Sequence, residues 1–341
     1  MHNPRLVAFY AMNKTKVAII GASGYSGQEL VRLLLRHPQV EIVQFTSRQY
    51  AGKPVSEIFP RFRGQVSATF IEPNAGKIAA DVAFLALPHG VAAEFAVPLL
   101  KNGVKVLDLS ADFRLKSPAT YKEFYEHDHP APALLEQAVY GLPELHRSKI
   151  KHAQLIACPG CYPTSIILGA TPALQKGLIK PDSIIVSSMS GVSGAGRKAV
   201  EDYLFCECNE SARAYSVPKH RHLSEIEQEL GATITFVPHL IPLNRGIEST
   251  IIANLTAKPD NVLALYREFY HGEPFVRVTD ALPDIKNVAT TNCCDISVRV
   301  DSRTNRLIIS SAIDNLTKGA AGQAVQCLNL VCGYAETDGL L

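Results

Sequence analysis

A cysteine at the start of an apolar helix is the first side chain that could do covalent chemistry. Cys161 lies in the segment ACPGCYPTSIILGATPAL, where Pro163 suits the first helical turn and an apolar run follows. The dipole at a helix N-terminus favours the thiolate, so this position predicts a lowered pKa and a nucleophile. Buried structural cysteine is the alternative, and we adopt it for the other seven cysteines.

A second cysteine three residues upstream, Cys158, opens other readings of the same segment. Cys-x-x-Cys spacing is also typical of half a zinc site or of a redox pair. A zinc site needs a second ligand pair, and the other pairs have the wrong spacing or are adjacent in sequence: Cys206 with Cys208, and Cys293 with Cys294. The sequence therefore favours no metal site. A disulfide between Cys158 and Cys161 that inactivates the protein on oxidation stays open as a hypothesis.

Three anion-seeking side chains, His220, Arg221 and His222, stand together in KHRHLSEIEQEL. A helix-forming run follows, with Ser224 as the expected N-cap. This geometry suits a carboxylate or phosphate and can present an imidazole for acid–base chemistry, although a single histidine is more often structural. Arg114 follows a predicted strand in LSADFRL, and Arg197 ends the glycine-rich segment SGVSGAGR; either arginine could be purely structural.

A glycine-rich turn near the N-terminus predicts a nucleotide-binding site. Gly21, Gly24 and Gly27 in GASGYSG follow a β-branched strand and open a helix, where backbone N–H groups suit a pyrophosphate. A tight turn without a ligand is the alternative. The next strand ends in Ser47 and Arg48 with no carboxylate, which favours NADP(H) over NAD(H), unless Arg48 is simply a solvated surface residue.

The elements around these residues predict an α/β protein of two domains, since 341 residues exceed one ordinary domain. Strands expected at 16–20, 40–48, 81–88 and 105–110 alternate with helices at about 25–37 and 91–103. This pattern is typical of a doubly wound parallel sheet, a Rossmann domain. We assign residues 14–157 to this domain and expect a C-terminal helix within 317–341 to complete it.

The second half of the chain reads as a substrate, catalytic and dimerisation domain, residues 158–316. Longer strands with more alternation are expected at 182–190, 233–243, 248–257, 294–301 and 306–314, which predicts a mainly antiparallel sheet in an α+β domain. A sheet of this kind could pair subunits, so a homodimer or homotetramer is expected.

Composition excludes several classes of protein. The 34 basic and 32 acidic residues leave a net charge of +2 and are scattered, so no nucleic-acid-binding surface is expected. No apolar stretch approaches the roughly 20 residues needed to cross a membrane. The first residues lack an export signal, and the segment before Met12 receives no role. Eight cysteines in a chain of this size indicate a reducing compartment, and we expect a cytoplasmic protein with a small-molecule partner.

Short-chain dehydrogenases combine a similar glycine-rich turn with Tyr-x-x-x-Lys on one helical face. That spacing occurs at Tyr10/Lys14 and at Tyr215/Lys219. The first pair precedes the cofactor-binding strand, and Pro218 would disrupt a helix through the second. The sequence therefore disfavours this class.

Ten segments, in this order, resemble the N-acetyl-γ-glutamyl-phosphate reductase family of arginine biosynthesis: GASGYSG, TSR, FLALPHGVA, DLSADFRL, YGLPEL, PGCYPTS, SGVSGAGR, KHRHLSEI, PHLIPLNRGI and DNLTKGAAGQA. The resemblance covers residues 16 to about 330, and PGCYPT and SGVSGAGR are its specific motifs. Aspartate-semialdehyde dehydrogenases share the architecture and the thiol chemistry but differ around the cysteine and the histidine. The chain departs from the pattern at SSMSG and at Cys158, where relatives often have asparagine.

The resemblance implies NADPH-dependent reduction of an acyl phosphate to an aldehyde through a thioester. It implies Cys161 as nucleophile, His222 as acid–base and Glu225 as the residue that orients His222. Candidates for the substrate carboxylate and phosphate are Arg114, Ser193, Arg197, His220 and Arg221. Candidates for the cofactor are Gly21, Ser23, Gly24, Tyr25, Ser26, Gly27, Ser47, Arg48, Pro88, Ser190, Gly191 and Asn315. Two alternatives stay open: a related acyl-phosphate reductase of the aspartate-semialdehyde or aminoadipate type, and a non-catalytic NADP(H)-binding sensor.

Overall fold

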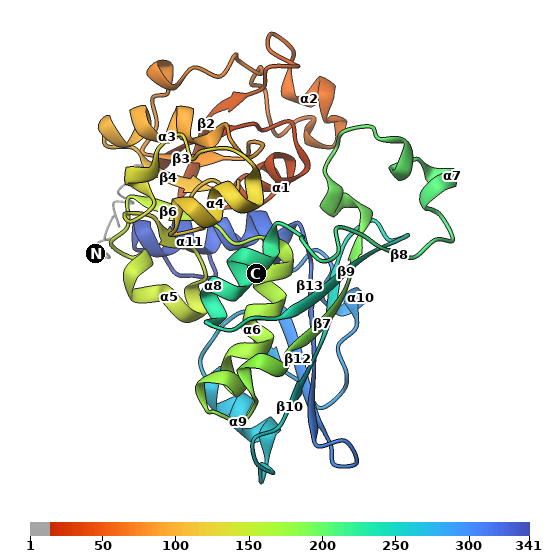
Figure 1. The fold of residues 1–341 in the computed structure, drawn as a ribbon. Coiled ribbons are helices and arrows are strands. Elements are labelled where there is room, and N and C mark those ends of the chain that lie inside the picture. Colours follow the sequence, from red (N-terminus) through yellow and green to blue (C-terminus); the bar gives the residue numbers. More distant parts are fainter. Residues whose placement is uncertain (1–13) are drawn as a thin grey trace, which may run out of the picture.

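The computed structural model describes residues 14–341, so the segment before Met12 and the Tyr10/Lys14 spacing lie outside the described residues. Two sheets organise the chain, one in each half of the sequence (Figure 1). Among the described residues, no helix is long and apolar enough to cross a bilayer. Between residues 215 and 219 the chain forms no helix, as Pro218 predicts.

The first sheet has six parallel strands in the order β2-β1-β3-β4-β6-β5. They are β1 Thr15–Ile20, β2 Val40–Thr46, β3 Val82–Leu85, β4 Lys105–Asp108, β5 Val139–Tyr140 and β6 Leu155–Ala157. The four expected strands are present, and their apolar residues are buried because helices cover both faces of the sheet. Helices α1 Tyr25–Leu34 and α3 Ala92–Lys101 follow β1 and β3 as expected.

The polar stretch between residues 115 and 155 is more ordered than the sequence indicated. It forms α4 Pro118–Tyr125 and α5 Pro143–Ile150, together with two short strands, the edge strand β5 and its neighbour β6. Strands of two and three residues leave no periodic pattern, which is why the sequence did not predict them.

The second sheet has seven strands in the order β11-β12-β13-β10-β7-β9-β8, and four of its six pairings are antiparallel. The strands are β7 Ile185–Gly191, β8 Arg213–Ala214, β9 Thr235–Ile241, β10 Ile247–Asn254, β11 Val276–Val278, β12 Cys294–Asp301 and β13 Arg306–Ile313. Helices α6 Cys161–Gln175, α8 His222–Leu230 and α9 Val262–Phe269 contribute to the apolar core on one face of this sheet. The short helices are α2 Val55–Ile58, α7 Phe205–Cys208 and α10 Ile285–Val288.

The chain returns to the first sheet at its end. After β13, a π-helical turn, Thr317–Ala321, leads into α11 Gly322–Cys332, whose buried residues join the core of the first sheet. Figure 1 shows α11, in blue, beside the yellow and orange elements of the first half. Arg245 pairs with Glu29 of α1 at 3.0 Å and with Asp314 at 2.6 Å, and so ties the two halves together next to this turn.

Candidate active site

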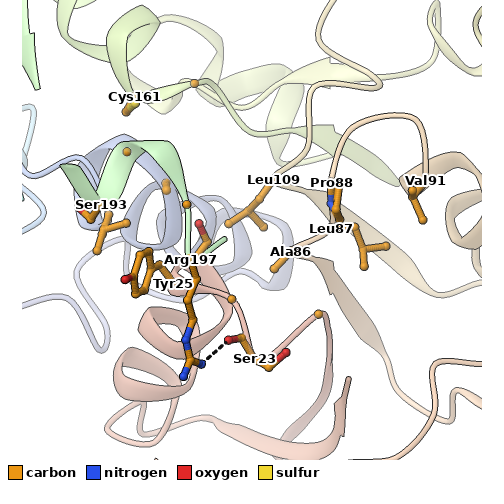
Figure 2. A pocket seen from close by; sticks show the side chains of 18 of the residues that line it. Ser23, Tyr25, Ala86, Leu87, Pro88, Val91, Leu109, Cys161, Ser193 and Arg197 are labelled. Atoms are coloured by element: carbon orange, nitrogen blue, oxygen red, sulfur yellow. Dashed lines mark hydrogen bonds between the residues drawn. The ribbon is translucent and has the colours of Figure 1, made fainter. Parts of the chain in front are cut away.

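A cavity of about 580 Å³ lies between the two halves, over the glycine-rich turn. Figure 2 shows Cys161 at one end of it and Ala86, Leu87, Pro88 and Val91 along one wall. Pi-helical turns are frequent at functional sites, and the turn Thr317–Ala321 contributes Gly319 and Ala320 to the lining. The expected cofactor residues that line the cavity are Gly21, Ser23, Gly24, Tyr25, Ser26, Ser47, Arg48, Pro88 and Asn315.

The three glycines of the turn have different physical roles. Gly21 has φ +88°, and a side chain there would collide with the Ala86 carbonyl at the end of β3. Gly27 faces away from the cavity, where a side chain would collide with the backbone of Gly21 and Ala22. Gly24 has only one neighbour within 4 Å of a Cβ placed there, the Gly21 carbonyl at 3.8 Å, so its missing side chain leaves room for a ligand.

The end of β2 forms one side of this cavity. The Ser23 and Ser47 hydroxyl oxygens lie 2.9 Å apart, which joins the glycine-rich turn to the strand end. No Asp or Glu lines the cavity among the described residues, whereas Arg48, Arg114 and Arg197 do. The donor set therefore suits a dinucleotide that carries an additional phosphate.

A second cavity, of about 320 Å³, also reaches Cys161. Its ionisable lining is mostly basic: His220, Arg221, Arg213 and Lys219 line it together with the acidic Asp202. Three residues line both cavities: Cys161, Gly194 and His222. The nucleophile candidate and the acid–base candidate thus stand where the two cavities meet.

Cys161 is the first residue of α6, as the sequence indicates, and Gly160 precedes it as the N-cap. Two glycines make room for the site. A Cβ on Gly319 would lie 2.7 Å from the Cys161 Cβ, and a Cβ on Gly160 would lie 2.5 Å from Nε2 of His222. Both contacts are much shorter than van der Waals distance, so backbone and side chains are closely packed around the thiol and the imidazole.

We expect Gly319→Ala to lower kcat by about 100-fold, because the added methyl group must displace Cys161, and misplacement by about 1 Å can cost that much. Steady-state kinetics of the purified variant measures this. The control is Gly76→Ala, an exposed glycine where a Cβ would approach only Asn74 Oδ1, at 3.4 Å. Wild-type kcat in Gly319→Ala would show that this contact does not position the thiol.

His222 begins α8 and is held by neighbouring rings. The centroid of its ring lies 4.9 Å from that of His220 and 5.9 Å from that of Tyr162. Its Nδ1 is buried and has no hydrogen-bond partner within residues 14–341. Burial, and then the neighbouring His220 and the positive charges of Arg114 and Arg221, hold the pKa of His222 well below its usual value, so the ring is neutral and can accept a proton.

The expected lowering of the Cys161 pKa is wrong for the unliganded protein. Burial raises the pKa of the thiol to about 11, although the backbone N–H of Tyr162 and the charge of Arg114 act in the opposite direction. Desolvation is the largest of these effects. The resting site at neutral pH therefore contains a thiol beside a neutral imidazole, and His222 must remove the proton when substrate binds.

The pH dependence of alkylation checks this pairing. The iodoacetamide reaction of Cys161 should accelerate continuously from neutral pH toward the thiol pKa of about 11, because only the thiolate reacts. Mass spectrometry of the peptide that contains Cys161 gives the rate. A fast reaction that is independent of pH below neutrality would contradict the account, since it would require a thiolate–imidazolium pair in the resting enzyme.

Glu225 is buried and holds the loop before Cys161. Its Oε1 accepts hydrogen bonds from the Gly160 N–H at 2.8 Å and the Tyr140 hydroxyl at 2.7 Å. Its Oε2 lies 3.2 Å from Nη1 of Arg114. The hydrogen bonds of Glu225 therefore go to these groups and not to His222, which corrects the role that the resemblance implied: Glu225 positions the Gly160–Cys161 backbone instead.

Replacing Glu225 by glutamine should destabilise the protein by about 3 kcal/mol, because Arg114 would keep a buried charge without its partner. Urea denaturation measures the loss of unfolding free energy. Glu94→Gln is the control, since Glu94 pairs with Arg48 at 3.8 Å on the exposed surface and should change stability little. Equal stability of Glu225→Gln and wild type would refute the buried-pair argument.

Arg114 also hydrogen-bonds the carbonyls of Cys158 and Leu109, at 2.9 and 3.0 Å. It lines the larger cavity, but these bonds and Glu225 occupy much of its guanidinium. Its role in substrate binding stays a prediction. Cys158 is buried in the core of the first sheet and Cys161 packs against the core of the second, so a disulfide between them would require this segment to rearrange.

The remaining expected site residues occupy different parts of the site. Ser190 lines the smaller cavity, and a side chain on Gly191 would collide with the backbone of Leu243 and Arg245. Ser193 lines the larger cavity, and its hydroxyl accepts a hydrogen bond from the Asn315 amide at 3.0 Å. Ser224 is not the N-cap of α8: it lies inside the helix, and its hydroxyl donates to the Arg221 carbonyl.

The sequence analysis missed two basic residues and two tyrosines of the smaller cavity: Arg213, Lys219, Tyr203 and Tyr215. They come from the segment between residues 196 and 221, ahead of α8, which has short helices and a two-residue strand. A cluster of hydroxyl and basic side chains just before KHRHLSEI was the available signal. Among the described residues, no group of three His, Cys, Asp or Glu side chains could hold a metal ion.

Two family models match this chain. The one described as "Semialdehyde dehydrogenase, NAD binding domain" matches residues 16–153, and "Semialdehyde dehydrogenase, dimerisation domain" matches residues 161–315. A curated N-acetyl-gamma-glutamyl-phosphate reductase from Akkermansia muciniphila is 55% identical over 96% of this chain and 99% of its own length. The reductase of the same name from Desulfotalea psychrophila is 54% identical over 95% of this chain and 97% of its own.

This chain belongs to the N-acetyl-γ-glutamyl-phosphate reductase family. Among solved structures, it shares the fold of aspartate semialdehyde dehydrogenase II from Vibrio cholerae, complexed with ASA, with a TM-score of 0.71 and 16% identity over 94% of this chain and 98% of that one. The aspartate semialdehyde dehydrogenase from Candida albicans, with NADP, has a TM-score of 0.69 and 15% identity over 94% and 98%. The resemblance found in the sequence motifs is thus confirmed for the family, and the fold class with it.

Proposed function

We propose that this reductase converts N-acetyl-γ-glutamyl phosphate to N-acetylglutamate 5-semialdehyde and inorganic phosphate with NADPH, a step of arginine biosynthesis. The observation that carries the proposal is the position of Cys161 and His222 at the junction of two cavities, one over the glycine-rich turn and one lined by basic residues. Substrate and cofactor can then reach the same thiol from different cavities. The names of the relatives at 54–55% identity fix the substrate.

The residues present fit the cofactor. A Cβ at Gly24 would point into open space over the turn, and the strand end offers Ser47 and Arg48 without a carboxylate. When bound there, NADPH supplies the hydride that reduces the thioester. Ser190, Gly191 and Asn315 remain candidates for the nicotinamide end, since Asn315 lines the larger cavity and its amide hydrogen-bonds Ser193 and Gly246.

His222 acts first, as a base. It takes the proton of the Cys161 thiol, and the sulfur attacks the acyl carbon while the bond to the phosphate oxygen breaks and inorganic phosphate leaves. The N–H groups at the start of α6 stabilise the negative sulfur as it forms. Cys161 then carries the acyl group as a thioester.

His222 acts second, as an acid. Reduction leaves an oxyanion on the hemithioacetal, and the protonated imidazole donates its proton to that oxygen. Collapse releases the aldehyde and returns the proton to the Cys161 sulfur through His222, so the site is restored. The basic groups of the smaller cavity, His220, Arg221, Arg213 and Lys219, are the candidates for the carboxylate and phosphate of the substrate.

Substrate selectivity tests the proposal. In the reverse direction, phosphate-dependent reduction of NADP+ should be robust with N-acetylglutamate semialdehyde and at least about 100-fold slower with aspartate semialdehyde. Aspartate semialdehyde lacks the acetyl group, so the part of the site that contacts this group would stay empty. Turnover with aspartate semialdehyde alone would move the chain to the neighbouring activity. Cofactor binding without turnover on either substrate would favour the non-catalytic sensor.

We also propose that the free face of the second sheet pairs subunits, as the description of the matching family model indicates. On this face Ile185 of β7 lies opposite Ile252 of β10, which lies opposite Ile308 of β13. Ile185 and Met189 are 47% and 45% exposed. Apolar side chains in a row on a broad sheet are typical of an interface.

The eight free cysteines fit the proposed cytoplasmic location.

Light scattering during size-exclusion chromatography checks the interface. The wild type should elute as a dimer or tetramer, and Ile185→Asp should shift it toward the monomer, because a carboxylate at the centre of a dry interface would be desolvated. Val217→Asp is the control at an exposed apolar residue away from the sheet. A monomeric wild type, or an unchanged Ile185→Asp assembly, would contradict this interface.

A further inference from the structure

Arg197 does not lie where the sequence analysis placed it. Its guanidinium points away from Cys161, toward the glycine-rich turn (Figure 2). Nη1 donates a hydrogen bond to the Ser23 carbonyl at 3.0 Å. The guanidinium carbon lies 5.1 Å from the centre of the Phe59 ring and 6.0 Å from that of Tyr50, within the range of cation–π attraction. A residue from the second half of the chain thus reaches the nucleotide-binding turn of the first half.

We propose that Arg197 binds the 2′-phosphate of NADPH and so contributes to the selection of NADPH over NADH. This inference rests on the proposed function for the identity of the cofactor. The groups that hold Arg197 also hold the end of β2. Ser23 and Ser47 are linked through their hydroxyl oxygens at 2.9 Å, and the Tyr50 N–H donates to Ser47 Oγ at 3.2 Å. The end of the second strand is where a doubly wound dinucleotide domain meets the ribose 2′ position.

The charges around this position favour a phosphate. No carboxylate lines the cavity among the described residues, so the ribose hydroxyls have no acidic acceptor there. Arg197 has five N–H donors, and one of them serves the Ser23 carbonyl. The other donors can give a phosphate the paired, charge-assisted hydrogen bonds that arginine forms well.

Arg197 is better fixed than Arg48, the other arginine at this end of the cavity. The side chain of Arg48 is 65% exposed, and its nearest acidic partner, Glu94, is 3.8 Å away and equally exposed. Arg197 is also exposed, but it packs over two aromatic rings and is tied to a backbone carbonyl. A preorganised guanidinium loses less freedom on binding, so Arg197 should contribute more of the phosphate affinity than Arg48.

Arg197 belongs to a segment that also lines the site around Cys161, so a 2′-phosphate bound by Arg197 would contact that segment. The segment that begins at Gly191 carries Ser193, which is hydrogen-bonded to Asn315, and Gly194, which lines both cavities. Arg197 lies three residues farther along the same segment. A phosphate bound by Arg197 would therefore hold this segment across the cleft, close to Cys161.

Binding of adenosine fragments to the unliganded enzyme tests the proposal without turnover. Isothermal titration with 2′,5′-ADP and with 5′-AMP should give, for Arg197→Met, a Kd for 2′,5′-ADP that is weaker by about 10–100-fold, as loss of one or two charge-assisted hydrogen bonds predicts. The Kd for 5′-AMP, which lacks only the 2′-phosphate, should change by less than about threefold. Arg197→Lys should recover part of the affinity, because it keeps the charge but not the fork of donors.

Arg61→Met is the matched control. Arg61 is exposed and packs on an aromatic ring in the same way, 5.8 Å from the centre of Phe62, but it lines only the neighbouring cavity. It should leave both affinities unchanged. Equal weakening of both ligands in Arg197→Met would place the arginine at the 5′-phosphate or the adenosine that they share, and unchanged affinity would remove it from the site; either result overturns the proposal. If the wild type binds 2′,5′-ADP but does not turn over either semialdehyde, the proposed function fails and the role of Arg197 stands.

Discussion

Replacing Cys161 by serine should abolish turnover, with kcat reduced by roughly 10⁴-fold or more, while the affinity for NADPH stays within about twofold. A serine hydroxyl is a far weaker nucleophile than a thiol beside a neutral imidazole, and no other thiol lines either cavity among the described residues. The residues of the glycine-rich turn are untouched by the change. Steady-state kinetics and fluorescence titration with NADPH measure the two quantities.

Cys206→Ser provides the control for this experiment, since Cys206 lines neither cavity and is exposed in α7, where the sequence analysis wrongly expected a buried cysteine. It should keep wild-type kinetics. Turnover by Cys161→Ser at more than about a tenth of the wild-type rate would rule out the covalent route. Loss of NADPH binding in the same variant would mean that the substitution disturbs the fold.

Replacing His222 by asparagine should lower kcat by about 100- to 10,000-fold, the range typical of a lost general acid–base group. The pKa of His222 is held well below its usual value by burial and by His220, Arg114 and Arg221. In the free wild-type enzyme the imidazole is therefore already unprotonated at neutral pH. Activity should fall only as the pH drops through that lowered pKa, and this acid limb should disappear in the variant.

His152→Asn is the control, because His152 is exposed, follows the end of α5 and lines neither of the two cavities at Cys161. The pH profile separates an acid–base role from a purely structural one. A His222→Asn enzyme with the wild-type pH profile and a small change in kcat would show that another group moves the proton.

The sequence predicted the helices and strands whose apolar residues run continuously or recur at a regular spacing. The parallel strands from Val17 onward and the long strands of the second sheet are runs of apolar or alternating residues, and each was found within a few residues of its expected ends. β5, β8 and β11 escaped prediction because two or three residues form a strand only when a neighbouring strand supplies the hydrogen bonds. The edges of both sheets depend on tertiary contacts.

A helix start singled out Cys161, and the family resemblance implied His222 as the acid–base residue; both line the junction of the two cavities. The sequence could not give the role of Glu225, because the partners of that carboxylate, Arg114 and the Gly160 N–H, are 111 and 65 residues away. The same limit applies to Arg197, whose partner Ser23 is 174 residues away. The predicted direction of the Cys161 pKa shift was wrong for a related reason. Desolvation depends on all the groups that surround the sulfur, and the helix N-terminus is only the local part of that environment.

The thioester on Cys161 can be observed directly. The enzyme is mixed rapidly with N-acetylglutamate semialdehyde and NADP+ in the absence of phosphate, and NADPH absorbance is followed from the first turnover. The account predicts a burst of one NADPH per Cys161, then a stall, with an N-acetylglutamyl group on the peptide that contains Cys161 and release of that group when phosphate is added. Steady NADPH formation without phosphate, and with Cys161 unmodified throughout, would contradict it.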